Sequence, residues 1–502
     1  MEEKEFLKLQ NGSDIRGVAL EGVAGEPVNL TENAALRIAK AFAIYLSKKL
    51  EKSCRDISIG IGHDSRLSAN GLKEGVLKGL AVEGCQIFDC GLASTPSMFM
   101  STVLEECGYD GAVMITASHL PFNRNGFKFF TKEGGLEKEE IRQILHIAAE
   151  ESNFGENLDQ IRVPTVNLLA IYSKYLKERI YSILGNDEKK PFKGLHIVVD
   201  ASNGVSGYFA DMLTDLGADI EGSICLEPDG TFPNHVPNPE NAQAMAMLRE
   251  ATLAAKADLG VIFDTDGDRA AVVFSDGEEV NKNAIIALMA SILSKEFPGT
   301  TVVTDSVTSN YLTEFLEKEL SMKHHRYKRG YKNVINEAIR LNIEGTETHL
   351  AIETSGHGAL KENYFLDDGA YMCVRIISEL ARCRQEGRKL EDLIRGLKKA
   401  EESKEIRIQI LQEDFASYGK KVVEDFTEYM TVQPEFQPVG ENYEGIRMNY
   451  KDKEAEGWVL LRLSLHDPLL VLNMEADREH GVQHILDKIT PFFKQYKRLG
   501  EF

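Results

Sequence analysis

The sequence predicts an α/β protein with three similar α/β domains of mixed, largely parallel sheets, followed by a smaller C-terminal α+β domain. Short β-branched runs bounded by glycine or aspartate alternate along the chain with stretches of helical period. This pattern repeats about three times before roughly residue 395. The 502 residues are too many for one compact core, and such a length favours about three to four domains.

Buried strands are predicted where apolar runs end in glycine or aspartate, at 56–62, 195–200, 258–264 and 301–305. A helix opened by Thr31 is expected over 30–51, because Ala and Leu recur there at helical spacing. In parallel α/β sheets, ligands bind at the carboxyl ends of strands. The polar residues that follow these strands are therefore the candidate site residues.

The chain changes character after the third repeat. Residues 398–405 are strongly charged, which is typical of a linker or an exposed helix end. Strand-like runs follow at 458–465 and 469–474, and a terminal helix is expected from about Val482. The predicted domains are 1–165, 166–285, 286–397 and 398–502.

Composition and charge narrow the class of protein. The net charge of −21 disfavours nucleic acid or an anionic membrane as the main partner, but allows a small phosphorylated ligand in a locally basic site. Seven cysteines without a CxxC spacing argue against a disulfide framework and a Cys₄ zinc site. The N-terminus lacks an apolar signal region, and the longest apolar stretch, 283–293, is too short to span a bilayer. A cytoplasmic protein is expected.

Ser118 and His119 form the first candidate motif, in a turn after an apolar run. A serine acts as a nucleophile when a base or a positive charge activates it. His119 and Lys128 could supply positive charge for a phosphate on Ser118. For this segment alone, an N-capping serine in a polar loop is the alternative.

Asp264, Asp266 and Asp268 form the second motif, directly after a predicted buried strand. Three carboxylates at alternate positions offer the oxygen ligands that suit Mg²⁺. An EF-hand is excluded because Gly267 falls between the second and third aspartates and Ser275 stands where its last glutamate belongs. A solvated acidic turn is the alternative, although such like charges repel unless a cation neutralises them.

Two further motifs carry polar side chains at alternate positions. Glu353, Ser355 and His357 suit hydrogen bonds to vicinal hydroxyls and one proton transfer, with a plain polar loop as the alternative.

Arg462, Ser464 and His466 could bind a phosphate through the arginine fork and two further donors, with a half-exposed polar strand as the alternative. The basic cluster at 328–332, which includes Lys328, is either a solvated face or a phosphate clamp.

The order of these motifs resembles the α-D-phosphohexomutase superfamily. That order is Ser-His, three aspartates, Glu-x-Ser-Gly-His and Arg-x-Ser-x-x-x-Pro, and the matching motifs run from 14–17 to Pro468, nearly the whole chain. Within the superfamily, the Gly356-His357 ending is most similar to the phosphomannomutase/phosphoglucomutase group.

The resemblance implies four domains around a central cleft and an isomerase that moves phosphate between C1 and C6 of glucose or mannose. It implies a hexose 1,6-bisphosphate intermediate and activator, and one Mg²⁺ per chain bound by a phosphate on Ser118 and by Asp264, Asp266 and Asp268. The groups expected at the transferring phosphoryl group are Ser118, Arg16, Arg269, His119 and Lys128. The residues expected to bind the sugar phosphate are Glu353, Ser355, His357, Lys328, Arg462, Ser464 and His466.

The chain departs from the family pattern at a few positions. Leu120 stands where an asparagine is usual, and His466 and Asp467 stand where hydroxyl residues are common. Ser13 stands where an aromatic residue is frequent. These changes leave the serine and the aspartates in place but affect the expected substrate preference.

Three alternative functions follow. A phosphoglucosamine mutase would need only a few different sugar contacts. A phosphatase with an aspartyl phosphate would want a hydroxyl residue where this chain has Asp268. A non-catalytic sugar-phosphate-binding protein would need neither Ser118 nor the aspartates. The sequence leaves the oligomeric state open.

Overall fold

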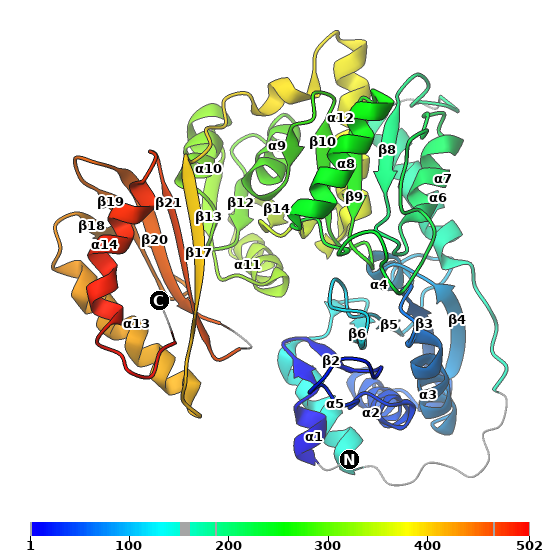
Figure 1. Cartoon of the computed structure of the whole chain (residues 1–502). Helices are drawn as coiled ribbons and strands as arrows, with labels where there is room; N and C mark the ends of the chain where they lie inside the picture. Colours follow the sequence, from blue (N-terminus) through cyan, green and yellow to red (C-terminus); the bar gives the residue numbers. More distant parts are fainter. Residues whose placement is uncertain (1–2, 151–160, 186–187, 465–466, 501–502) are drawn as a thin grey trace. The chain divides into compact units, whose positions relative to one another are not determined.

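The structure is a computed structural model that describes residues 3–150, 161–185, 188–464 and 467–500. The chain divides into two compact units. Figure 1 labels their helices and strands. Unit 1 comprises 1–281 and 355–391, and unit 2 comprises 282–354 and 392–502. None of the helices in the described ranges is long and apolar enough to cross a membrane.

The first sheet of unit 1 has the strand order β1-β2-β6-β5-β3-β4, and β7 pairs with β6. Strands β5, β3 and β4 run parallel, whereas β6, β2 and β1 are antiparallel additions. The strands are β1 (Gln10–Asn11), β2 (Asp14–Val18), β3 (Ser58–His63), β4 (Gln86–Leu92), β5 (Gly111–Ile115), β6 (Arg124–Thr131) and β7 (Gly134–Gly135). The accompanying helices are α1 (Glu3–Leu7), α2 (Glu32–Leu50), η1 (Cys54–Asp56), α3 (Ala69–Val82), α4 (Thr95–Met100) and α5 (Lys138–Glu150).

Helix α2 illustrates why these segments fold as they do. The Thr31 side chain accepts a hydrogen bond from the Ala34 N–H and starts the helix, and Glu51 ends it in the left-handed region. Its small and apolar residues, among them Phe42, are buried in the core of this domain. The helix predicted over 30–51 is confirmed.

The second sheet of unit 1 has the order β11-β10-β9-β8. Only β8 and β9 are parallel in this sheet as described. Its strands are β8 (Ile197–Asp200), β9 (Leu259–Phe263), β10 (Ala270–Phe274) and β11 (Glu279–Val280). The helices are α6 (Leu168–Leu184), α7 (Gly207–Asp215) and α8 (Ala242–Ala255). Unit 1 also contains β15 (Gly358–Leu360), η3 (Lys361–Asn363), β16 (Leu366–Asp367) and α12 (Gly369–Gln385).

Unit 2 contains a parallel set and an antiparallel sheet. The parallel strands lie in the order β13-β12-β14. They are β12 (Thr301–Thr304), β13 (Lys323–Arg326) and β14 (Thr348–Ile352), with α9 (Lys282–Ser294), α10 (Asn310–Glu314), η2 (Phe315–Glu319) and α11 (Tyr331–Ile343). A short turn, η4 (Leu390–Ile394), precedes the second sheet.

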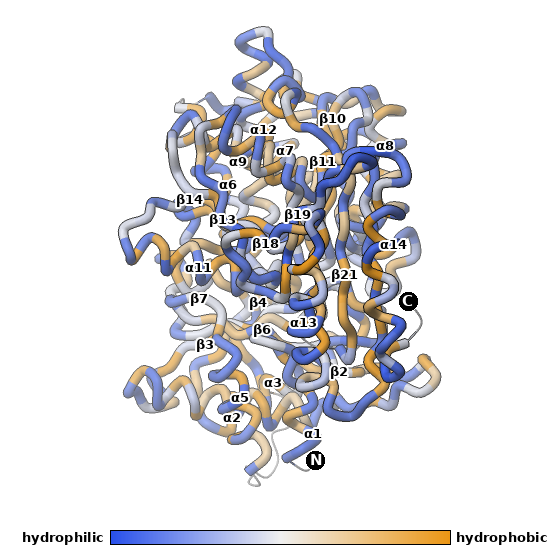
Figure 2. The backbone as a smooth tube through the Cα atoms, turned by 90° about the vertical axis from the view of Figure 1, so that its left-hand side faces the viewer, coloured by the Kyte–Doolittle hydropathy of each residue, from blue (hydrophilic) through white to orange (hydrophobic). Residues whose placement is uncertain are grey.

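The C-terminal sheet is antiparallel, in the order β17-β21-β20-β19-β18. It consists of β17 (Glu402–Gln409), β18 (Phe436–Pro438), β19 (Ile446–Lys451), β20 (Glu456–Leu463) and β21 (Leu469–Ala476), with α13 (Phe415–Thr431) and α14 (Gly481–Phe493). Hydrophobic stretches along β21 stand out in Figure 2 and match its largely buried residues. The strands and the terminal helix predicted for this region are confirmed.

The prediction for 398–405 is wrong in its second half. Residues 402–405 begin β17, which pairs along its whole length with β21. An edge strand exposes much of its surface to water, so it carries charged side chains that resemble a linker in sequence. The predicted α/β architecture with a smaller C-terminal α+β part is otherwise confirmed, and the four domain boundaries stay predictions.

Candidate active site

Ser118 lies in the turn after β5, and its hydroxyl lies between an acid and a cation. Its Oγ donates a hydrogen bond to Asp264 Oδ2 at 2.8 Å and accepts one from Arg269 Nη2 at 3.1 Å. Its backbone N–H donates to Thr116 Oγ1 at 2.8 Å, and its φ of 48° lies in the left-handed region. The hydroxyl is thus held in one direction, toward the aspartate loop.

The aspartate loop follows β9, whose residues are all buried. Asp264, Asp266 and Asp268 are buried, and they can present one carboxylate oxygen each within 4.8 Å of one another. Gly267 has a φ of 75°, and a Cβ there would lie 2.9 Å from Ser206 Oγ, so the turn requires glycine. The predicted alternation thus brings the carboxylates together instead of spreading them over a surface.

Two buried carboxylate oxygens of this loop accept no hydrogen bond from the described residues. They are Oδ1 of Asp266 and Oδ1 of Asp268. The other oxygens are paired: Thr95 Oγ1 donates to Asp266 Oδ2 at 2.5 Å, and Lys128 Nζ donates to Asp268 Oδ2 at 2.9 Å. Because a buried acceptor without a partner is costly, these oxygens fit a hard divalent cation such as Mg²⁺.

The negative charges of the neighbouring carboxylates repel one another. Burial, and next the charge of Asp268, raise the pKa of Asp264 well above its usual value, although Arg269 opposes the shift. Burial also disfavours ionised Asp268, but Lys128 and Arg269 outweigh it and lower the pKa of Asp268. A bound cation would favour the ionised form of every member.

Arg16 and Lys128 reach this region from neighbouring strands, β2 and β6. Arg16 donates to Asp14 Oδ2 at 2.8 Å and to the carbonyl of Thr116, which precedes the serine turn. Lys128 Nζ also lies 3.9 Å from Asp14 Oδ2. The two cations therefore share Asp14 as a counter-ion beside the Ser118 turn.

His119 lies beside the nucleophile candidate. Its Nδ1 is 3.4 Å from Ser118 Oγ, and its side chain is exposed. Partial desolvation, followed by the charges of Arg269 and Arg16, lowers the pKa of His119. The imidazole is therefore neutral and keeps a lone pair at neutral pH.

Ser355 and His357 also belong to unit 1. The Gly356 carbonyl accepts the Ala270 N–H at 3.3 Å, which ties this loop to the end of the aspartate loop. His357 Nε2 lies 3.8 Å from Asp268 Oδ1, and its Nδ1 is 2.7 Å from Ser355 Oγ. Burial and then the charge of Arg269 lower the pKa of His357 well below its usual value.

Glu353 and Lys328 belong to unit 2. Glu353 is buried, and its Oε1 accepts the Gly330 N–H at 2.6 Å. Gly330 lies within the predicted basic cluster at 328–332 and has a φ of 114°. Lys328 is exposed, with its Nζ 5.6 Å from the centre of the Tyr327 ring. Glu353 thus fixes the end of the loop that carries Lys328.

Arg462 and Ser464 lie at the end of β20, also in unit 2. Arg462 is buried, and its Nη1 is 3.6 Å from Glu444 Oε1. Ser464 Oγ accepts the Asp467 N–H at 3.3 Å. The candidate residue His466 lies outside the described residues.

Comparisons with known proteins agree with this arrangement. Models of the phosphoglucomutase/phosphomannomutase α/β/α domains match in order: domain I at 7–154, domain II at 170–277 and domain III at 281–400. A phosphoglucomutase of Neisseria gonorrhoeae is 30% identical over 93% of this chain and 94% of its own length. The chain belongs to the phosphoglucomutase/phosphomannomutase family. It is therefore a member of the α-D-phosphohexomutase superfamily and a hexose phosphate mutase, an isomerase.

Other relatives span the same length. A phosphomannomutase/phosphoglucomutase of Pseudomonas putida is 31% identical over 86% of each chain. The crystal structure of a phosphoglucomutase/phosphomannomutase family protein from Burkholderia thailandensis superposes with a TM-score of 0.77 at 25% identity, covering 97% of each chain. The similarity of this mutase to its relatives therefore extends beyond the three matched domains.

Several residues of the mutase site escaped the sequence reasoning. Thr95, at the start of α4, also donates its backbone N–H to the Asp266 carbonyl at 2.8 Å, but nothing in its segment signals this contact. Thr116 lies two residues before Ser118, but the sequence pattern predicts no role for it. Asp64 and Arg66 follow the predicted strand at 56–62. Their place at the carboxyl end of a strand is the sequence signal that could have marked them as site residues.

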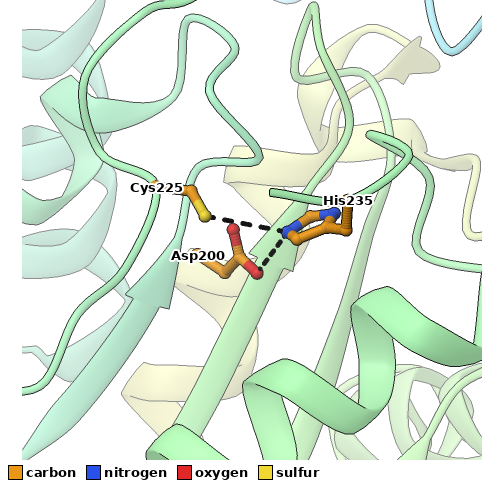
Figure 3. A group of neighbouring side chains, drawn as sticks. All are labelled: Asp200, Cys225 and His235. Atoms are coloured by element: carbon orange, nitrogen blue, oxygen red, sulfur yellow. Dashed lines mark hydrogen bonds and ion pairs between the residues drawn. The ribbon is translucent and has the colours of Figure 1, made fainter. Parts of the chain in front are cut away.

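The mutase contains a second cluster of possible metal ligands, Asp200, Cys225 and His235 (Figure 3). His235 Nδ1 lies 2.9 Å from the Val236 carbonyl and its Nε2 lies 2.9 Å from Asp200 Oδ2. Cys225 Sγ is 3.9 Å from the same Nε2. Burial alone would lower the pKa of His235, but the hydrogen bonds to Asp200 and Cys225 raise it, to about 10. A proton on the imidazole thus neutralises Asp200.

Proposed function

We propose that this mutase interconverts the 1-phosphates and 6-phosphates of glucose and mannose, with Ser118 as the residue that carries the phosphate. The observation that supports this most is the placement of Ser118 Oγ between Asp264 at 2.8 Å and Arg269 at 3.1 Å. Phosphoryl transfer needs an aligned oxygen and positive charge around it more than it needs covalent chemistry.

In the first step, a sugar hydroxyl attacks the phosphorus of phosphorylated Ser118. The P–O bond to the sugar forms, the bond to Ser118 Oγ breaks, and the product is a hexose 1,6-bisphosphate. The neutral imidazole of His119 takes the hydroxyl proton, and a phosphate on the adjacent serine would raise the pKa of that ring. After the bisphosphate turns over, Ser118 takes back the other phosphate.

Positive charge stabilises the transferring phosphoryl group. Arg269 already donates to Ser118 Oγ, and Arg16 and Lys128 lie on the strands beside the turn. Mg²⁺ held by Asp264, Asp266, Asp268 and a phosphate oxygen of Ser118 would neutralise further oxygen charge. Hexose 1,6-bisphosphate serves as the activator that phosphorylates Ser118 when its hydroxyl carries no phosphate.

The remaining candidates bind the rest of the substrate. Glu353, Ser355 and His357 hold sugar hydroxyls, with Lys328 as a further cation. Arg462, Ser464 and His466 bind the phosphate that does not react. The free cysteines of the described chain support a cytoplasmic protein. Its strongly negative charge supports sugar phosphates, and neither nucleic acid nor membranes, as its partners.

A coupled assay tests this function. The protein receives Mg²⁺, trace glucose 1,6-bisphosphate and, in parallel, glucose 1-phosphate, mannose 1-phosphate or glucosamine 1-phosphate. Conversion of the first two to 6-phosphates supports the proposal, and Ser118→Ala should abolish it while the fold is kept. Conversion of glucosamine 1-phosphate alone would make the chain a phosphoglucosamine mutase, and conversion of none would contradict the proposal.

A further inference from the structure

Arg66 donates hydrogen bonds to the backbone carbonyls of the turn that contains Ser118. It lies in the loop after β3 and is 2% exposed. Its Nη1 donates to the Pro121 carbonyl at 2.8 Å and to the Arg124 carbonyl at 3.0 Å. Its Nη2 donates to the Leu120 carbonyl at 2.6 Å and to the carbonyl of Ser118 itself. One guanidinium therefore gathers the carbonyls of most of the turn.

Asp64 fixes the guanidinium in this position. Its Oδ2 accepts Arg66 Nε at 3.2 Å, and its Oδ1 accepts the Arg66 N–H at 3.0 Å. The Asp64 N–H in turn donates to the Ile115 carbonyl at the end of β5, at 3.1 Å. Both charged side chains are fully buried. The Asp64–Arg66 pair is thus attached to β5, the strand that leads into the serine turn. Several hydrogen bonds together fix its geometry.

The serine turn needs such support. A non-glycine residue in the left-handed region costs about 1–2 kcal/mol, and Ser118 has a φ of 48°. This conformation turns the Ser118 carbonyl toward Arg66 and its hydroxyl toward Asp264. Because Arg66 donates to the backbone carbonyl of Leu120, this hydrogen bond does not depend on the side chain that departs from the family pattern.

We propose that Arg66, held by Asp64, is a positioning residue that sets the direction of Ser118 Oγ for phosphoryl transfer. It acts through the backbone of the turn and takes no phosphate itself. The inference rests on the proposed role of Ser118.

The test compares Arg66→Ala and Arg66→Lys with Arg37→Ala. Arg37 is a matched control, because it is also buried in the same domain and donates to the carbonyls of Ala148 at 2.9 Å and Ala149 at 2.8 Å. Each variant is assayed well below its own melting temperature. A displacement of about 1 Å can cost about 100-fold in rate, so Arg66→Ala should lower kcat by about that factor with KM within about twofold.

Further readouts separate positioning from stability. Single-turnover phosphorylation of Ser118 by glucose 1,6-bisphosphate should slow by the same factor as kcat in Arg66→Ala and should be unchanged in Arg37→Ala. Arg66→Lys should recover only part of the rate, because an ammonium group cannot reproduce the planar fork.

An unchanged kcat in Arg66→Ala, or an equal loss in Arg37→Ala, overturns the inference. If Arg66→Ala does not fold, Arg66→Lys and Asp64→Asn decide: slowed phosphorylation in folded protein supports the inference, and normal phosphorylation in both overturns it. An active Ser118→Ala would instead refute the proposed function, so the two failures are distinguishable.

Discussion

Two neighbouring parallel strands of unit 1, β8 and β9, each lead into a cluster of possible metal ligands, and the two clusters differ in how their carboxylate oxygens are bonded. Asp200 ends β8 and joins Cys225 and His235, whereas Asp264 follows β9 and joins Asp266 and Asp268. In the first cluster His235 neutralises Asp200, whose Oδ1 accepts the Ser202 N–H at 2.8 Å.

In the second cluster, buried oxygens of Asp266 and Asp268 lack a hydrogen-bond donor within the described parts of the chain. A buried aspartate with ligand-like neighbours therefore does not by itself indicate a metal. Several neighbouring buried carboxylate oxygens without a hydrogen-bond donor, which a cation can serve together, are the better sign.

The largest effect is expected from Asp266→Asn. It removes a charge from the cation cluster, and a metal ion supplies several kcal/mol of transition-state stabilisation, so kcat should fall by about 1,000-fold. The measurement is kcat as a function of Mg²⁺ concentration. Full recovery at high Mg²⁺ would contradict the assignment of Asp266.

The same substitution at the other cluster, Asp200→Asn, should act on stability instead. It leaves a buried imidazolium without its counter-charge, and breaking such a pair costs about 3–5 kcal/mol. Urea unfolding should show this loss, while kcat measured at low temperature stays near wild type. A strong loss of kcat in folded Asp200→Asn would contradict the expectation that this cluster acts on stability alone.

Mg²⁺ should stabilise the folded chain through the cluster of Asp264, Asp266 and Asp268 only. At a free concentration of about 100 Kd, a ligand of the native state adds about 2.7 kcal/mol to the free energy of unfolding. Thermal melts with and without Mg²⁺ should show the shift in wild type and Asp200→Asn and no shift in Asp266→Asn. A shift that survives in Asp266→Asn would place the cation elsewhere.

The smallest effect near neutral pH concerns His235. Its pKa is raised from about 6.5 in the unfolded chain to about 10 in the fold, so its contribution to stability is complete below about pH 6.5. That contribution falls as pH rises and is lost through about pH 10. Unfolding free energies from pH 6 to 10 should decline more steeply in wild type than in His235→Gln. Parallel pH profiles would show that His235 is neutral in the fold.

The sequence predicted the parts of the site that are local in the chain. Asp264, Asp266 and Asp268 are two residues apart after an apolar strand, and Gly267 permits the tight turn that brings them together. Contacts between distant segments were not predictable in this way. Thr95 reaches Asp266 across 171 positions, and no spacing rule connects them.

The same limit applies to the cluster of Asp200, Cys225 and His235 and to β17. Asp200 and His235 are 35 residues apart and belong to no recognised spacing. The charged stretch at 402–405 resembles a linker or an exposed helix end, because exposure at a sheet edge selects the same side chains.

The C-terminal sheet ends in two edges that a second molecule would find hard to extend. The β17 edge exposes Lys404, Glu405 and Arg407, so an approaching strand would have to strip water from a row of charges. The opposite edge, β18, is only 3 residues long and ends in Pro438, which has no N–H to offer. Unpaired backbone groups at a sheet edge commonly start intermolecular β aggregation. Both edge strands of this sheet disfavour such pairing.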